Sequence, residues 1–152
     1  ILVHERTLVA DTGGAGRQRG GLATRVTMEP RGESVTLTYG IEGKINPPKG
    51  VRGGHDGTEP STWVEDLKTG ERREIPVVGR YDLQSGEKVV SITPGGGGYG
   101  DPLERDVLAV LDDYRESRIS LEAAAAHYGV VITDGAIDET ATAKTRESRL
   151  AS

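Results

Sequence analysis

Glycine is concentrated in three stretches of this 152-residue chain, and these stretches restrict its possible folds more than any other feature. They are DTGGAGRQRGG at 11–21, EGKINPPKGVRGGHDGTEP at 42–60 and TPGGGGYGDP at 93–102. Glycine has no Cβ, so it buries little apolar surface and allows two backbones to approach closely. With 22 glycines, one Trp and no Phe, the chain has few large side chains for a core. We therefore expect it to lean on a partner surface.

The third glycine stretch has two possible roles. Its candidate ligand- or interface-binding residues are Gly95, Gly96, Gly97, Gly98 and Tyr99. Consecutive backbone N–H groups ahead of a helix can bind phosphate. However, Asp101 and Pro102 occupy the expected helix start, where a carboxylate repels phosphate and a proline lacks the N–H. We therefore favour a structural role, in which the run passes close to another backbone and leads into a helix.

The first glycine stretch places two arginines on flexible backbone. Arg17 and Arg19 are flanked by glycines, of which three are further candidates: Gly13, Gly14 and Gly16. Guanidinium groups pair bidentately with carboxylate or phosphate, so the stretch could bind an anionic ligand or a partner. The alternative is that both arginines pair with acidic side chains of the chain itself. If either glycine stretch binds an anion, we expect it to be this one.

The three histidines give little indication of a metal site or of catalysis. His55 lies in the long glycine- and proline-rich loop and is a candidate binding residue, because loops of this length are often functional. The other histidines, His4 and His127, are far from it in sequence, and no pair has metal-ligand spacing. The chain has no cysteine, which excludes thiolate ligands and disulfides. We predict no metal site and no catalytic residue in this chain.

Alternating apolar residues predict strands in the first two thirds of the chain. The predicted strands lie at 1–10, 21–29, 33–43, 61–67, 73–78 and 87–93. Turn residues separate them, and KTGE at 68–71 and QSGE at 84–87 predict two tight hairpins.

Helical periodicity begins after residue 100. Asp101 suits the N-cap, Pro102 the first helical position, and Glu104 can complete a capping box. A short helix is expected at 121–128 and a last, polar helix after Asp138.

The predicted fold is α+β, with mainly antiparallel β structure in residues 1–95 followed by C-terminal helices. We expect one domain, made of a β-rich portion with the glycine loops at 1–100 and a helical portion at 101–152.

Charge and hydropathy narrow the possible partners. The net charge is −5 and no basic stripe is present, which argues against nucleic acid as the main partner. No apolar run reaches membrane-spanning length and no signal peptide is evident, so we expect no membrane partner and a cytoplasmic location.

The three glycine stretches, in this order, resemble the hydantoinase B/5-oxoprolinase family. The matching residues are DTGGAGRQRGGLATR, then PPKGVRGGHDG, then TPGGGGYGDPLERD with the helical sequence that follows. The resemblance covers roughly residues 5–145, and it depends on three ordered motifs rather than on one glycine run. Thr12 and Ala23 depart mildly from the usual pattern, and family members are several times longer.

The resemblance implies a C-terminal domain or small subunit of an ATP-dependent enzyme that hydrolyses cyclic amides. An alternative within the resemblance is a small subunit of an acetone- or acetophenone-type ketone carboxylase. It implies hydantoinase A-like and further hydantoinase B-like chains as partners in a hetero-oligomer, with ATP and a divalent metal bound outside this chain. A stand-alone anion-binding or interaction module is the alternative from another class.

Overall fold

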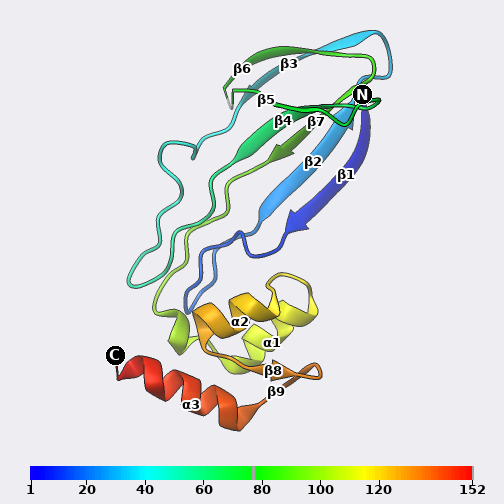
Figure 1. The fold of residues 1–152 in the computed structure, drawn as a ribbon. Helices are drawn as coiled ribbons and strands as arrows, with labels where there is room; N and C mark the ends of the chain where they lie inside the picture. The colour runs from blue at the N-terminus through cyan, green and yellow to red at the C-terminus, as the bar shows by residue number, and fades with distance from the viewer. Residues whose placement is uncertain (77, 152) are drawn as a thin grey trace.

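The computed structural model describes residues 1–76 and 78–151, and Figure 1 shows an elongated molecule with sheets at one end and helices at the other. The main sheet has five antiparallel strands in the order β1-β2-β7-β4-β5. Its strands are β1 (Leu2–Val9), β2 (Ala23–Glu29), β4 (Ser61–Asp66), β5 (Arg72–Glu74) and β7 (Glu87–Ile92).

A second, two-stranded sheet packs against the main sheet. It pairs β3 (Ser34–Gly40) with β6 (Val78–Gln84) in antiparallel register. One apolar cluster lies between the two sheets, where β3 turns apolar side chains inward at every second residue and β4 contributes the buried Val64. Its buried members are Val64, Ile75, Leu83 and Val89, with Met28, Leu37, Tyr39 and Tyr81 packed around them.

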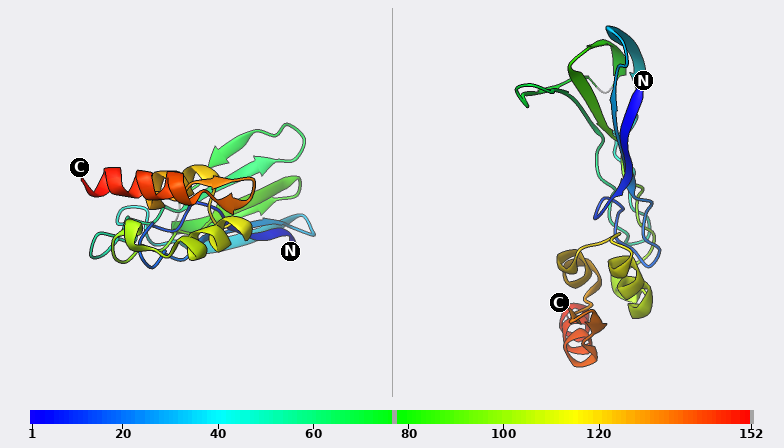
Figure 2. Two further views of the ribbon diagram at one scale, coloured as in Figure 1. Left: turned by 90° about the horizontal axis from the view of Figure 1, so that it is seen from below. Right: turned by 90° about the vertical axis from the view of Figure 1, so that its right-hand side faces the viewer.

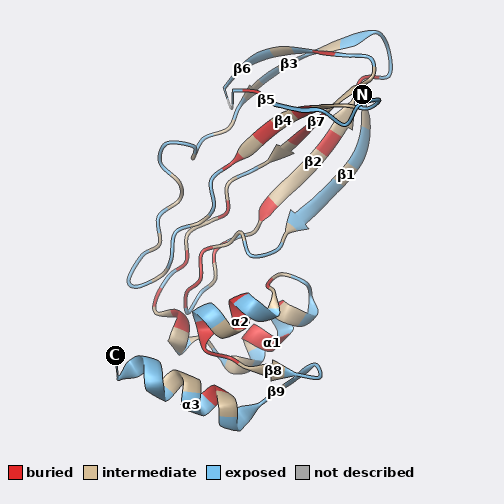
Figure 3. Ribbon diagram, viewed as in Figure 1, coloured by how far each residue is buried: buried red, intermediate tan, exposed pale blue. Residues whose placement is uncertain are grey.

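The helical end has its own apolar cluster. It contains the 3-10 helix η1 (Pro102–Glu104), α1 (Val107–Arg115), α2 (Leu121–Tyr128) and α3 (Glu139–Leu150), with a small β8–β9 hairpin (Ile132–Thr133 and Ala136–Ile137). Figure 3 shows buried residues on α1 and α2, whereas α3 is largely exposed. The buried members are Ala15, Val110, Ile119, Ala123, Ala124, Tyr128 and Val130.

Hydrogen bonds hold α3 in place. The Arg146 guanidinium donates to the backbone oxygens of Tyr128, at 3.0 Å, and Arg105, at 2.8 Å. The Val131 N–H donates to the Thr142 hydroxyl at 3.0 Å. The backbone groups in these bonds are buried or half-buried and need hydrogen-bond partners. Because side chains of α3 supply these partners, a polar helix can cover this end of the molecule.

Three glycine-rich segments connect the main sheet to the helices. We call residues 12–21, 48–58 and 94–100 together the glycine bundle; they run side by side between the two ends (Figures 1 and 2). Every segment bonds to both others through the backbone. Gly14 donates to Gly96 at 2.8 Å, His55 donates to Ala15 at 2.7 Å, and Gly98 donates to His55 at 2.9 Å.

The bundle requires glycine because its backbones touch. A Cβ on Gly20 would collide with the carbonyl of Gly96, and one on Gly98 would collide with the carbonyl of Ala15. The same reasoning explains collagen, where only glycine fits at the crowded axis. The structural role favoured from sequence for the Gly95–Gly98 run, a close pass against other backbone, is therefore confirmed.

One buried carboxylate, Asp113 on α1, joins the glycine bundle to the helical end. Arg19 from the bundle donates to it through Nε at 3.1 Å, and Arg105 donates through Nη2 at 2.7 Å. Arg118 adds a longer contact at 3.5 Å. The Asp113 side chain is only 3% exposed. Desolvation by burial raises the pKa of Asp113, but the hydrogen bonds and charges of Arg19 and Arg105 lower it more, so that the net shift is downward.

The α+β fold predicted from sequence is confirmed, with mainly antiparallel strands and a last helix at the C-terminal end. The KTGE hairpin is also correct, because it joins the paired strands β4 and β5.

The QSGE hairpin is wrong in its pairing. The chain does turn at 85–86, but β6 pairs with β3 and β7 enters the main sheet between β2 and β4. Strand β6 itself was not predicted, because VGRYDLQ lacks a clear alternation of apolar residues.

The helix predicted to start at Asp101 is interrupted. Asp101 does cap a helical turn, accepting a bond from the Leu103 N–H at 2.8 Å, but this turn is the short 3-10 helix η1. The chain is extended at Arg105, which lets its guanidinium reach Asp113. Asp106 then caps a new helix by accepting from Leu108 and Ala109, and α1 begins at Val107.

We expect Gly20→Ala to lower the free energy of unfolding by about 3 kcal/mol, because the new Cβ would push apart two backbones of the bundle. The neighbouring Gly21→Ala is the matched control: its Cβ would meet nothing within 4 Å, so the change should be below about 1 kcal/mol. Urea unfolding of both variants measures the difference. Equal midpoints would contradict the close backbone packing.

We expect Asp113→Asn to cost about 3 kcal/mol of stability, because it leaves buried guanidinium groups without a carboxylate. Asp112→Asn, one residue earlier and exposed, should change stability by less than about 0.5 kcal/mol. Denaturant unfolding compares the two. A similar effect from both would show that the arginine contacts contribute no stability.

The same carboxylate predicts a pH dependence. Because the pKa of Asp113 is lowered in the folded state, its charge stabilises the fold fully above its unfolded value of about 3.9. This contribution is lost as the pH falls through the lowered folded value. The stability gap between wild type and Asp113→Asn should therefore shrink as the pH is reduced from about 5 to about 2. A gap that stays constant in urea titrations over this range would contradict the prediction.

Candidate functional site

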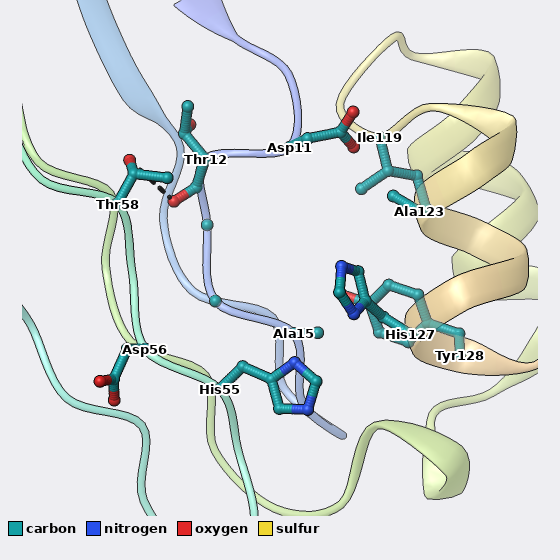
Figure 4. Close-up of a pocket in the computed structure, with 12 residues that line it drawn as sticks. Asp11, Thr12, Ala15, His55, Asp56, Thr58, Ile119, Ala123, His127 and Tyr128 are labelled. Atoms are coloured by element: carbon teal, nitrogen blue, oxygen red, sulfur yellow. Dashed lines mark hydrogen bonds between the residues drawn. The ribbon is translucent and has the colours of Figure 1, made fainter. Parts of the chain in front are cut away.

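A small pocket of about 100 Å³ lies where the glycine bundle meets helix α2 (Figure 4). Segments far apart in the sequence form it: the turn after β1, the bundle segment 48–58, and α2. The polar residues that line it include Asp11, Thr12, His55, Asp56, Thr58 and His127. The glycine bundle shapes this pocket, because Gly13 and Gly14 form part of its wall.

Asp11 fixes the first wall of the pocket to the helical end. It lies in the left-handed region with φ of 60°, a conformation that Asp tolerates better than most residues. Its N–H donates to the Arg118 carbonyl at 3.1 Å, and its carboxylate accepts from the Ser120 N–H at 2.8 Å. Ser120 is the N-cap of α2. The start of α2 is thereby tied to the start of the bundle.

Tyr128 fixes the other end of α2. It is 1% exposed, and the backbone N–H of Gly16 bonds to its hydroxyl. The Arg105 guanidinium lies 5.9 Å from the centre of its ring. Burial raises the pKa of the Tyr128 hydroxyl, so this group remains neutral. Both ends of α2 are therefore held against the bundle.

His55 and His127 meet at the mouth of the pocket. Their ring centres are 5.2 Å apart and the ring planes are nearly perpendicular, at 85°. In Figure 4 the two rings lie near one another, His55 coming from the bundle and His127 from α2. Partial desolvation lowers the pKa of His127, and His55 and Arg149 lower it further, whereas Asp11 raises it. His127 therefore favours the neutral form, in which an imidazole nitrogen can accept a hydrogen bond or bind a metal.

The structure brings together most of the candidates chosen from sequence. Gly13, Gly14, Gly16, the Gly95–Gly98 run and His55 all belong to the glycine bundle. Their role in binding a ligand or an interface stays a prediction. His127 and Asp11 were missed as pocket residues, because His127 lies 72 positions after His55 and nothing local marks either one. Only the folding of the bundle against α2 places them together.

The two candidate arginines differ in their surroundings. Arg19 is mostly buried and pairs with Asp113, which is the alternative weighed from sequence. Arg17 is half exposed, and its Nη1 lies 3.9 Å from Glu104. Tyr99 is exposed, and the Arg52 guanidinium lies 5.6 Å from its ring centre. Arg17, Arg52 and Tyr99 are thus the residues of this group that a ligand or partner could reach.

Within residues 1–76 and 78–151, no group of three or more His, Asp or Glu side chains is arranged to hold a metal ion. Over the same described part of the chain, no helix has both the length and the apolar character needed to cross a bilayer.

Solved structures share this architecture. The crystal structure of the ATP-dependent caprolactamase from Pseudomonas jessenii matches with a TM-score of 0.76 and 31% identity, over 95% of this chain and 26% of that chain. A nucleotide-free acetone carboxylase structure matches with a TM-score of 0.69 and 19% identity, over 99% of this chain and 25% of the other. The second likeness shows the fold alone.

Similar sequences show more directly to which family the chain belongs. The beta chain of the Pseudomonas jessenii caprolactamase is 39% identical over 93% of this chain and 25% of its own length. The B component of a putative D-/L-hydantoinase from Pseudomonas sp. (strain NS671) is 34% identical over 88% of this chain and 22% of its own length. The chain thus spans about a quarter of the length of these relatives. Residues 1–102 match the Hydantoinase B/oxoprolinase family, and the chain belongs to this family.

Proposed function

We propose that this chain is one part of an ATP-dependent enzyme of the hydantoinase B/5-oxoprolinase type that opens cyclic amides. It is either a small subunit or a C-terminal domain, and it is not catalytically complete alone. The observation that carries the proposal is the 39% identity with the caprolactamase beta chain over 93% of this chain. The region that matches the family contains the whole glycine bundle, which is the most constrained part of the fold.

The proposed contribution of the chain is a rigid scaffold. The glycine bundle holds the main sheet and the helices at a fixed separation, and its hydrogen bonds leave little freedom between them. ATP and a divalent metal would bind to hydantoinase A-like partners and to the remaining hydantoinase B-like polypeptide.

Exposed apolar side chains support a role within a larger assembly. Ile45 is 90% exposed and Val78 is 66% exposed, and both line the same open groove beside β6. Leu150 on α3 and Leu8 on β1 are also mostly exposed. Large apolar side chains gathered on a groove are typical of surfaces that another polypeptide covers.

Ketone carboxylation is the alternative within the same family. It rests on the fold shared with acetone carboxylase, which at 19% identity carries less weight than the likeness to caprolactamase. Adding acetone with and without bicarbonate to the assembled mixture distinguishes the two reactions, because carboxylation needs bicarbonate and hydrolysis does not.

We expect the purified chain alone to show no ATP hydrolysis with caprolactam, hydantoin or 5-oxoproline, because it spans only a quarter of its relatives. Mixed with the hydantoinase A-like and remaining hydantoinase B-like polypeptides of its source organism, it should assemble and support substrate-dependent ADP release. Leaving this chain out of the mixture is the control. Turnover by the chain alone, or undiminished turnover without it, would refute the proposal.

A stand-alone anion-binding module is the candidate from another class, and the exposed Arg17 favours it. Calorimetry with ATP, ADP and phosphate tests it on the isolated chain. Binding that is lost in Arg17→Ala would support the module. Arg19→Ala is unsuitable for this test, because removing a partner of buried Asp113 would destabilise the fold. Absence of binding would favour the role within a larger enzyme.

A further inference from the structure

We propose that His55 and His127 form a binding site for a divalent transition-metal ion of the Zn²⁺ class, between the glycine bundle and helix α2. The proposal concerns this chain's own surface and does not depend on the enzyme assignment above. It rests on the geometry of the two rings, the rigidity of the elements that carry them, and the charge and exposure of the pocket mouth.

The separation of the two rings fits a shared ion. Zinc binds an imidazole nitrogen at about 2.0–2.1 Å, so a ring centre lies about 3.2 Å from the metal. Two imidazoles at a tetrahedral angle then have their centres about 5 Å apart. The observed separation of the ring centres of His55 and His127 is 5.2 Å, and the two rings are neighbours at the pocket (Figure 4).

Both histidines sit on backbone that cannot easily move. The N–H of His55 donates to Ala15 and its carbonyl accepts from Gly98, which ties it to both other segments of the bundle. His127 precedes Tyr128, whose buried ring and bond to Gly16 anchor the end of α2. Ligands held in place before binding lose little conformational freedom when the ion arrives. The backbone positions from which the two rings extend are therefore a property of the folded chain.

The charge and exposure of the pocket mouth suit a hydrated cation. The Asp11 carboxylate lines the same pocket and interacts favourably with a positive charge at His127. Arg149 acts in the opposite direction, although its Nη1 already donates to the Ala126 carbonyl at 2.7 Å. Both histidines are exposed, so water can complete the coordination. Two protein ligands give a weaker site than the usual three or four, with a Kd on the order of 10 µM.

The alternative for this pair is an edge-to-face contact between two aromatic rings without any ion. Such contacts are common between aromatic side chains at this distance. The two possibilities differ in a measurable way, because only a metal site binds Zn²⁺ with one ion per chain and depends on both rings. The third histidine, His4, provides a matched control, since it lies on β1 and pairs with Glu29 at 3.0 Å.

The experiment is calorimetric titration of the tag-free chain with Zn²⁺ in a non-coordinating buffer near neutral pH, repeated with Co²⁺ and followed by visible absorption. The wild type and the variants His55→Ala, His127→Ala and His4→Ala are compared. Thermal unfolding of each variant without metal shows whether it is folded. We expect one ion per wild-type chain, binding at least tenfold weaker in either variant of the pair, and unchanged binding in His4→Ala.

Two results would overturn the proposal. One is the absence of saturable Zn²⁺ binding to the wild type below about 1 mM, far above the expected Kd. The other is binding that survives in folded His55→Ala and His127→Ala, or that is lost in His4→Ala, because the ion would then be held elsewhere. If alanine variants unfold, His55→Gln and His127→Gln replace them, since glutamine keeps polar bulk without an imidazole nitrogen.

Discussion

The structure depends on the glycines of three segments, because these residues have no Cβ atom. Where the segments of the glycine bundle cross, backbone lies directly against backbone, and hydrogen bonds join each segment to the other two. The two apolar clusters lie on opposite sides of this bundle, which contributes Ala15 to the helical one. Each cluster is small for a chain of this length, so the bundle and the Asp113 contacts are what make the two ends one body.

Much of the fold could be predicted because it follows local patterns. Alternation indicated the face of β3 that turns inward, and Ser120 and Gly129 begin and end α2 as their capping preferences indicate. The errors arose where pairing or tertiary contacts override local signals. A turn at 85–86 looks like a hairpin from its residues, but the partner of β6 lies some 40 residues earlier in the chain. Similarly, the helical turn that begins at Asp101 ends at Arg105, which is extended and donates a hydrogen bond to Asp113.

The candidate site was less predictable than the fold. The glycines could be chosen from sequence because the absence of a side chain has a direct physical meaning, close approach. The encounter of His55 with His127 has no such local sign, since it requires both the bundle and the docking of α2. Arg19 shows another limit of prediction from sequence. An arginine beside glycines is equally suited to an external anion and to an internal carboxylate, and only the folded position of Asp113 decides between them.

The order in which the glycine bundle can form during synthesis follows from its connectivity. Its bonds join positions such as Gly14 and Gly96, or Ala15 and His55, so the first segment must wait until the last has left the ribosome. Closing such long loops costs entropy before any contact is gained, and folds dominated by distant contacts form slowly. Strands β1 and β2 can pair early as neighbours, but they remain an isolated hairpin of marginal stability until residue 100 arrives. The bonds between the first and third segments of the glycine bundle therefore form only after both segments have been synthesised, and strands β1 and β2 pack into the complete main sheet at that stage.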